Sequence, residues 1–248
     1  AAFLRGVGNA WLAGDADVSS NPYFKKFFPW YQRPFLTLPF AVADRFEVRK
    51  RLSERQPRCI ATGSVHDLRL EVPASAYRAY MEATGLHTYH PLRAELYAQR
   101  DSIADIIEVR VSPYRDYGDA RSAWKRAWNH FSVKQKAHFA YDIVDLYNDY
   151  TFAVVGEEAS GFPALGMFEA MACGCVVFAD PKALEGLGLV SGTHYLAHDG
   201  TLAGLLSELA ADRVSSQLST LSDAGAHYVK HHFSAAVVGQ RWMRTLRS

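Results

Sequence analysis

Two short apolar runs, residues 152–155 and 175–179, stand on either side of a polar, glycine-containing turn and a segment of mixed character. Short apolar runs bounded by turn residues are typical of buried strands. The mixed segment, residues 163–172, has the apolar spacing of a short helix, and Gly174 after it favours a helix end. Residues 150–180 therefore read as strand, turn, helix, strand, which predicts the parallel crossover unit of an α/β sheet.

The same patterns recur along the rest of the chain. Strands are expected at residues 58–62 and 106–111 and at the edge position 192–199, and helices at 76–81, 120–128, 202–209 and 235–246. Strands that alternate with helices predict an α/β fold with a Rossmann-like parallel sheet flanked by helices. The strand at 58–62 runs into Gly63, and a strand that ends in a glycine turn is the usual opening of a nucleotide-binding layer.

Residues 1–45 differ from this pattern. The stretch 21–34 is aromatic and basic and contains three prolines, so it cannot be one long helix. It could meet a membrane or a lipid-linked substrate, or its aromatic rings could pack against a neighbouring domain while its lysines face water. Charges are dense over residues 41–57, where we expect a domain boundary, with the second domain starting near residue 56. The chain starts at Ala1 without Met, as expected of a piece of a longer protein.

Composition excludes several classes of protein. The 27 Lys and Arg nearly cancel the 26 Asp and Glu, so the chain lacks the basic field that nucleic-acid binding requires, and we expect no nucleic-acid partner. The three cysteines, Cys59, Cys173 and Cys175, are an odd number, which argues against a disulfide framework and favours a reducing, cytoplasmic compartment. No run approaches the ~20 apolar residues that a membrane span needs, and no signal pattern is present at the N-terminus.

The stretch 150–180 also suggests chemistry. A helix that begins near Pro163 would offer unpaired N–H groups and the positive end of its dipole to the turn at 156–162, where a diphosphate would fit. Glu169 lies one turn further, and helical side chains lean toward the N-terminus. Its carboxylate could accept two hydroxyl hydrogen bonds from a ribose. The alternative is a glutamate on the helix surface.

Several other polar residues allow two interpretations each, one structural and one functional. His66 is either a turn residue or a ligand-binding residue. His87 and His90 suggest a metal, but no third ligand lies near them, so we expect no metal site and assign them to local structure or acceptor contact. Lys134 and Lys136 could neutralise a phosphate or could simply face water.

Residues 162–180, and above all 168–177, resemble the donor-site segment of GT-B glycosyltransferases of the group 1, family 4-like type, in which a glutamate is followed by Ala-Met-Ala-x-Gly. Residues 38–46 resemble the segment that joins the two domains of that fold, and residues 59–64 resemble the first strand of its C-terminal domain. Phe233 and Ser234, with the helix that follows, resemble the closing helix. The resemblance implies that residues 1–45 are the end of an N-terminal, acceptor-side domain with its linker, and that residues 56–248 form the nucleotide-sugar-binding domain.

The resemblance assigns Glu169 to the donor ribose, and Gly161 and Phe162 to the loop whose backbone faces the sugar diphosphate. The full set of expected donor-binding residues is Glu169, Ser160, Gly161, Phe162, Gly63, Ser64 and His66. Two departures stand out. The family's earlier glutamate falls on Gly161 or, after a shift of one, on Ser160, so Glu158 is the candidate that could take the catalytic role. Ser64 replaces the family's phosphate-binding arginine, and these two changes leave retention or inversion open.

The function implied is transfer of a sugar from a nucleotide diphosphate sugar to a hydroxyl of a glycan or lipid-linked acceptor, as in polysaccharide biosynthesis. Helix N–H groups, with His66 or a lysine, would stabilise the leaving diphosphate in place of a metal ion, and no cofactor is expected. We expect a cytoplasmic protein, with peripheral membrane contact as one option. The alternative is a non-catalytic nucleotide- or sugar-binding module of the same fold, which the replacements at Gly161 and Ser64 favour.

Overall fold

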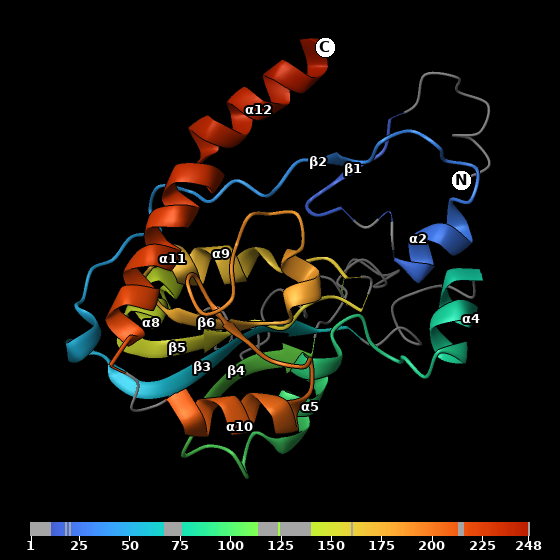
Figure 1. The fold of residues 1–248 in the computed structure, drawn as a ribbon. Coiled ribbons are helices and arrows are strands. Elements are labelled where there is room, and N and C mark those ends of the chain that lie inside the picture. Colours follow the sequence, from blue (N-terminus) through green and yellow to red (C-terminus); the bar gives the residue numbers. More distant parts are fainter. Residues whose placement is uncertain are drawn as a thin grey trace.

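The centre of the molecule is a parallel β-sheet with helices on both faces (Figure 1). The structure, a computed structural model, describes residues 11–17, 19, 21–66, 76–113, 124, 140–159, 161–212 and 216–247. These residues form a five-stranded sheet of β3 (Gln56–Val65), β4 (Ile107–Pro113), β5 (Tyr150–Val154), β6 (Val176–Ala179) and β7 (Leu196–Ala197). The predicted α/β class with a parallel sheet flanked by helices is confirmed.

The strands lie in the order β4-β3-β5-β6-β7, and all neighbouring pairs are parallel. The chain moves outward from β3 to β4, returns to place β5 on the other side of β3, and then moves outward again. The connections that leave β3 and β5 therefore lead in opposite directions across the sheet, and the switch point lies between these two neighbouring strands. Ligands of doubly wound sheets bind in the crevice at such a switch point, beyond the carboxyl ends of the strands.

Two hydrophobic layers hold the helices to the sheet. One face carries α8 (Ile143–Asp149), α9 (Leu165–Ala172) and α11 (Leu218–Phe233), and the other carries α5 (Pro91–Gln99) and α10 (Leu202–Asp212). Successive strand residues alternate between the layers: Ala153 packs into the first, and Phe152 and Val154 pack into the second. Because both faces are covered, every residue of β5 is buried, which explains its unbroken apolar run.

The N-terminal part forms a separate parallel pair, β1 (Ala13–Gly14) and β2 (Leu36–Thr37), joined by α2 (Pro22–Phe27). Within it, Phe24 is buried and packs against Phe28 and Phe35, with ring centroids 5.1 and 5.5 Å away. Phe27 packs edge-on against Tyr80 of α4 (Ala76–Ala83). These contacts agree with the interpretation that the aromatic rings of this stretch pack against neighbouring parts of the protein.

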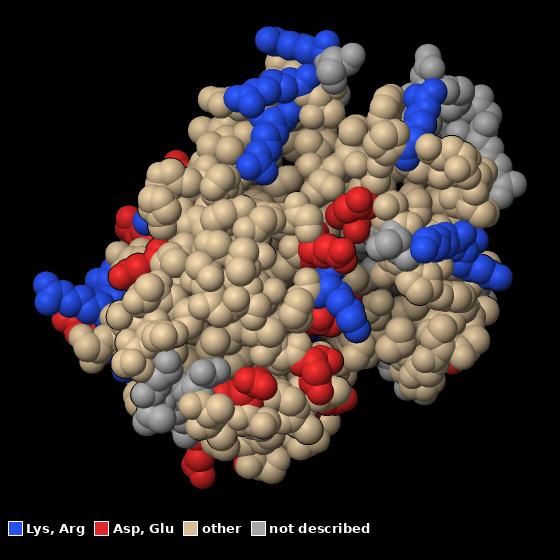
Figure 2. Space-filling model, viewed as in Figure 1, with Lys and Arg blue, Asp and Glu red and all other residues tan. Residues whose placement is uncertain are grey.

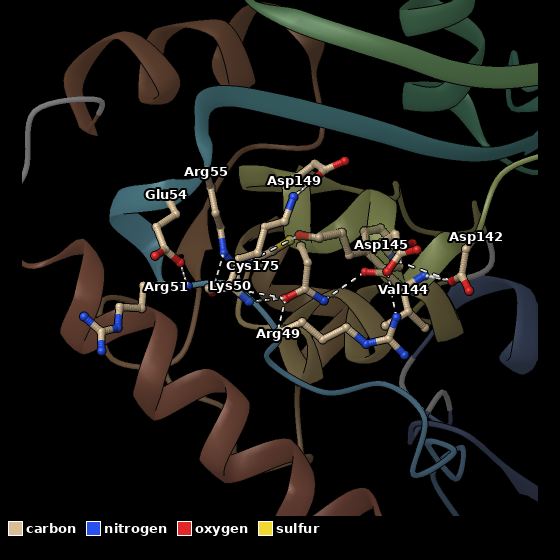
Figure 3. Close-up of polar contacts among 12 residues, drawn as sticks. Arg49, Lys50, Arg51, Glu54, Arg55, Asp142, Val144, Asp145, Asp149 and Cys175 are labelled. Carbon is tan, nitrogen blue, oxygen red and sulfur yellow. Dashed lines mark hydrogen bonds and ion pairs between the residues drawn. The ribbon is translucent and has the colours of Figure 1, made fainter.

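The predicted boundary at residues 41–57 is a strap that crosses the ends of α8 and α9 (Figure 3). Arg55 is its anchor: the guanidinium, on a residue only 6 % exposed, donates to the carbonyl oxygens of Cys173 (2.7 Å), Lys50 (2.8 Å) and Tyr147 (3.3 Å). The carbonyls of Tyr147 and Cys173 lie at the C-terminal ends of α8 and α9, where a cation is favoured. The assignment of the two flanking segments to separate domains stays a prediction.

Asn148 adds a second set of contacts to the strap. Its side-chain oxygen accepts the backbone N–H of Arg49 at 2.7 Å, and its amide nitrogen donates to the carbonyl of Glu47 at 3.0 Å. Arg49 also pairs with Asp145, at 2.6 Å, and the Lys50 ammonium contacts Asp149. The dense charge of this stretch therefore binds the strap to α8, and Figure 3 shows these side chains converging on that helix.

Some predicted boundaries are wrong. Helix α9 begins at Leu165, not Pro163, because Ala164 is still extended (ψ 136°) after a turn that closes on itself. The edge strand is shorter than the predicted 192–199, since only Leu196–Ala197 pairs with β6. The 16-residue α11 was not predicted, and the closing helix α12 spans Ala235–Arg247. The predicted helix at 120–128 and the residues Lys134 and Lys136 lie outside the described residues. Among the described helices, none is both long and apolar enough to cross a bilayer.

Candidate functional site

Four of the expected donor-binding residues and the catalytic candidate Glu158 lie at the carboxyl edge of the sheet, at its switch point. Gly63 and Ser64 lie at the end of β3, and His66 follows directly. Glu158 and Gly161 lie in the turn after β5, which is hydrogen-bonded to β3. Carboxyl ends of parallel strands share one edge, so the topology brings together residues that are about a hundred positions apart in the chain.

An arginine that was not predicted holds this edge together. Arg93, in the first turn of α5, donates through its guanidinium to the carbonyl oxygens of Val155, Ser64 (3.2 Å) and Gly156 (3.0 Å). Gly63 has a φ of +123°, and a Cβ there would lie 3.0 Å from Arg93 Nε. The Arg93 guanidinium therefore packs directly against Gly63, in the space where another residue would carry its Cβ atom.

The charge of Arg93 is balanced inside the protein. Burial lowers its pKa to about 10, and the carboxylates of Glu158 and Glu157 act in the opposite direction. Arg93 therefore stays protonated at neutral pH. A sequence signal for it did exist: a basic residue in the first turn of a helix faces the positive end of the dipole and is unfavourable without a specific partner. The partners themselves lie on β3 and β5 and only folding reveals them.

Two histidines meet beside this arginine. The ring centroids of His66 and His90 lie 5.4 Å apart. His90 is 7 % exposed, and burial, with the charges of Arg93 and His66, lowers its pKa to about 3, so its imidazole is neutral. Its buried Nδ1 has no hydrogen-bond partner among the described residues. His87, by contrast, is exposed, and the described residues contain no group of three or more His, Cys, Asp or Glu side chains placed to hold a metal.

The turn after β5 is closed by its own backbone. The N–H of Glu158 donates to the carbonyl of Phe162 at 3.0 Å, and the N–H of Gly161 donates to the carbonyl of Glu158 at 2.8 Å. Gly161 has a φ of +86°, and a Cβ there would lie 2.8 Å from the amide nitrogen of Asn21, so glycine is required. The assignments of Gly161 and Phe162 to a diphosphate stay predictions, and Ser160 lies outside the described residues.

Glu169 lies on the partly exposed side of α9 with Leu165 and Gly166. Burial raises the pKa of Glu169, and the positive charge of Arg45 in the strap opposes that shift. A Cβ on Gly166 would lie 3.1 Å from the Tyr147 hydroxyl, which is hydrogen-bonded to Thr62 at 2.9 Å. The first turn of α9 therefore lies over the end of β3, and Glu169 lies one turn away from it.

A cleft of about 440 Å³ lies at the junction of this edge with the N-terminal part. Six of its lining residues are charged, namely Asp17, Glu157, Glu158, Asp180, Glu185 and Lys182. Figure 2 shows acidic side chains gathered at the middle of the molecule, with a basic one among them. Five carboxylates against one ammonium make this cleft unfavourable for a diphosphate.

Glu157 and His198 form a buried pair beneath this cleft. Glu157 Oε1 accepts the N–H of Asp180 at 2.7 Å and lies 3.8 Å from His198 Nε2. His198 Nδ1 accepts the N–H of Gly200 at 2.9 Å, so the ring proton belongs on Nε2, facing the carboxylate. Burial raises the pKa of Glu157, and the charge of His198 opposes that shift.

Replacing Glu157 by glutamine should make folding less sensitive to pH. The folded-state pKa of Glu157 is above the unfolded value, so its carboxyl favours the folded state below pH ~4.5 and this contribution is lost as the pH rises. We expect Glu157→Gln to match the wild type near pH 4 and to be more stable at pH 8, by about 1 kcal/mol. Urea unfolding across this pH range measures it. The control is Glu185→Gln, an exposed carboxyl at the same cleft; a pH-independent difference for Glu157→Gln would contradict the expectation.

The fold and site define a class. In the GT-B arrangement, the switch-point edge of a doubly wound parallel sheet faces the residues that follow the strands of a second parallel sheet. The chain has this GT-B glycosyltransferase fold. The resemblance seen in residues 162–180 is confirmed at the level of the fold.

Solved glycosyltransferases are similar to this chain over nearly its whole length. Sucrose-phosphate synthase from Thermosynechococcus elongatus matches 95 % of the chain with a TM-score of 0.53 and 13 % identity, and 57 % of its own chain is covered. HepE of Anabaena, in complex with UDP and glucose, matches 96 % with a TM-score of 0.56 and 11 % identity, with 63 % of its chain covered. A glycosyltransferase from Rickettsia africae matches 98 % with a TM-score of 0.51 and 12 % identity, with 66 % covered. The chain thus spans about three fifths of their length. No protein-family profile and no curated protein matches the sequence.

Proposed function

We propose that this chain carries the nucleotide-sugar site of a glycosyltransferase, which moves a sugar from a nucleoside diphosphate sugar to a hydroxyl of a glycan or lipid-linked acceptor. The observation that carries the proposal is the position of Glu169, partly exposed on α9, beside Arg45 and one turn from the end of β3. The fold supports it, since the similar HepE structure contains UDP and glucose.

The donor would bind across the switch point, with its diphosphate at the start of α9 and at Gly63, Ser64 and His66. The N-terminal end of a helix and its dipole favour an anion, and at α9 the N–H groups of Leu165 and Gly166 would face it, since that of Met167 donates to the carbonyl of Ala164. Glu169 would accept the two ribose hydroxyls. The leaving diphosphate would be stabilised by these groups, with no metal ion or cofactor taking part.

Glu158 is the carboxylate that we assign to the reacting centre. It interacts electrostatically with Arg93 and with Asp15 of the N-terminal part, so it lies where the donor edge meets the opposite wall. We place the reaction in the cytoplasm, in polysaccharide assembly, with peripheral membrane contact where the acceptor is lipid-linked. All three cysteines are buried and none of them is in a disulfide, which supports a reducing compartment.

A non-catalytic binding module is the second candidate. The family's earlier glutamate falls on Gly161 or, after a shift of one, on Ser160, and neither residue is a carboxylate. At Gly161 the φ of +86° would also strain any residue with a side chain. Donor binding without any transfer or hydrolysis would favour this module over the transferase.

Thermal unfolding with nucleoside diphosphates and their sugars tests the donor site. At a ligand concentration of ten times Kd the unfolding midpoint should rise by about 3–5 °C, since binding adds about 1.4 kcal/mol. Glu169→Ala should weaken the affinity by roughly 10- to 100-fold, because it removes a charged acceptor of two hydrogen bonds. Glu208→Ala, an exposed change on α10, is the control. If no nucleotide or nucleotide sugar raises the unfolding midpoint, or if each raises it equally in Glu169→Ala and the wild type, the donor assignment is wrong.

A further inference from the structure

A second cleft, of about 380 Å³, lies beside the acidic one and shares Glu158 with it. Its walls come from four segments of the chain, at the ends of β1 and β2, in the turn after β5 and on α12. The lining residues are Ala13, Gly14, Asp15, Leu38, Glu158, Phe162 and Trp242. Its volume falls within the ~300–1,000 Å³ range of small-molecule pockets.

The packing of Phe162 shapes one side of this cleft. A Cβ on Gly14 would lie 2.9 Å from the Phe162 ring and 3.0 Å from the Phe35 ring, so glycine lets both rings lie against the end of β1. The N–H of Leu38 donates to the carbonyl of Gly14 at 2.8 Å and holds β2 beside it. The apolar wall is therefore built by close packing and does not depend on a flexible side chain.

The opposite wall is a tryptophan on α12, the helix that rises from the end of α11 away from the sheet (Figure 1). Trp242 is 42 % exposed, and its ring lines the cleft. A large aromatic ring left partly in water beside a cleft is an ordinary feature of sites that bind a ligand with an apolar face.

The polar groups of this cleft are acidic. Asp15 and Glu158 face it from the two sides, and no lysine or arginine is among the described residues that line it. Burial, and next the charge of Glu158, raise the pKa of Asp15 to about 6. Two carboxylates repel an anion, so the diphosphate of a donor does not fit this cleft. They do accept hydrogen bonds from hydroxyl groups.

We propose that this second cleft binds a neutral sugar ring, with its hydroxyl groups donating to Asp15 and Glu158 and its C–H face packed on Trp242. The inference rests on the proposed function, for which this ring is the acceptor. Glu158 borders both clefts, so an acceptor hydroxyl held here lies next to the residue assigned to the reacting centre.

Saturation-transfer NMR of the whole chain with the methyl glycosides of glucose, galactose, mannose and N-acetylglucosamine tests the site, with choline as a cationic probe. We expect saturation transfer from the protein to the ring C–H protons of at least one glycoside. Trp242→Ala and Asp15→Asn should each lower its affinity roughly tenfold. Met243→Ala, the neighbouring exposed residue of α12 that lies outside the cleft, should change nothing. Circular dichroism and unfolding midpoints show whether each variant is folded.

If none of the glycosides shows saturation transfer from the protein, or if the wild type and both cleft variants show the same saturation transfer, the proposal is overturned. Trp242-dependent binding of choline with no glycoside binding would overturn it in favour of a cationic ligand. If the chain binds a donor but no glycoside, the sugar site in the second cleft is wrong and the proposed function stands. If it binds a glycoside but no donor, the sugar site stands and the proposed transferase function is wrong.

Discussion

Replacing Arg93 by methionine is expected to lower the free energy of unfolding by roughly 2–4 kcal/mol. The guanidinium donates to carbonyl oxygens of Val155, Ser64 and Gly156, at the ends of both central strands. Methionine fills a similar volume and donates nothing, so these carbonyls lose their donor in a place that is almost closed to water. For a chain of this length the unfolding midpoint should fall by roughly 5–12 °C.

Urea unfolding of Arg93→Met, Arg93→Lys and Arg100→Met measures this effect. Lysine keeps the charge but cannot reach the separate carbonyls as a planar fork does, so its loss should be intermediate. Arg100 lies just beyond α5, is exposed and contacts near neighbours in the sequence, the Tyr97 carbonyl at 2.8 Å and the exposed Asp101 carboxylate at 3.7 Å, so its change should be near zero. A loss in Arg93→Met no larger than that of Arg100→Met would show that the contacts at the switch point do not stabilise the fold.

Arg55→Met is expected to cost a similar amount, roughly 2–4 kcal/mol. Arg55 is 6 % exposed and donates to carbonyls at the C-terminal ends of α8 and α9 and to Lys50 of the strap. Removing the cation takes the guanidinium donor away from both helix ends, although the Tyr147 carbonyl keeps the Cys175 thiol as a donor at 2.9 Å. It also removes the favourable interaction of the cation with two dipoles. It also releases the strap, so the variant should be cleaved faster by protease within residues 43–54.

Arg51→Met is the matched control for this prediction, because Arg51 is exposed and lies one turn away on the same strap. Its stability and its rate of cleavage should equal those of the wild type. If Arg55→Met unfolds at the wild-type urea midpoint, the network in Figure 3 contributes no net stability, and residues 41–57 act as a plain linker.

Local pattern was enough to predict the central unit of this fold. The apolar runs at 152–155 and 175–179 are β5 and β6, and the segment between them contains α9, because a strand buried on both faces must be apolar throughout and a helix must not. Boundaries were predicted less well. The start of α9 depends on how the turn at 158–162 closes, and the length of β7 depends on how far β6 extends beside it.

The candidate site was predicted only in part. Gly63, Ser64, His66, Glu158 and Gly161 follow predicted strands, so their common edge followed from parallel topology. Arg93 carries only the weak signal of a basic residue in the first turn of a helix, and its partners are carbonyls at the ends of two distant strands. Trp242 carries no local signal, because the cleft that it lines is formed with β1. The pairing of Glu157 with His198 likewise joins the ends of strands 40 positions apart in the chain.

The sequence by itself determined the α/β class, the parallel crossover at 150–180 and the resemblance centred on Glu169, because each depends on the order and period of nearby residues. Tertiary structure decided which groups have partners and what charge surrounds them. Packing placed Arg93 against the strand ends, gathered five carboxylates around the 440 Å³ cleft and brought Trp242 and Asp15 to the same second cleft. Burial and distance set the strength of hydrogen bonds and charges, and neither quantity exists until distant segments meet.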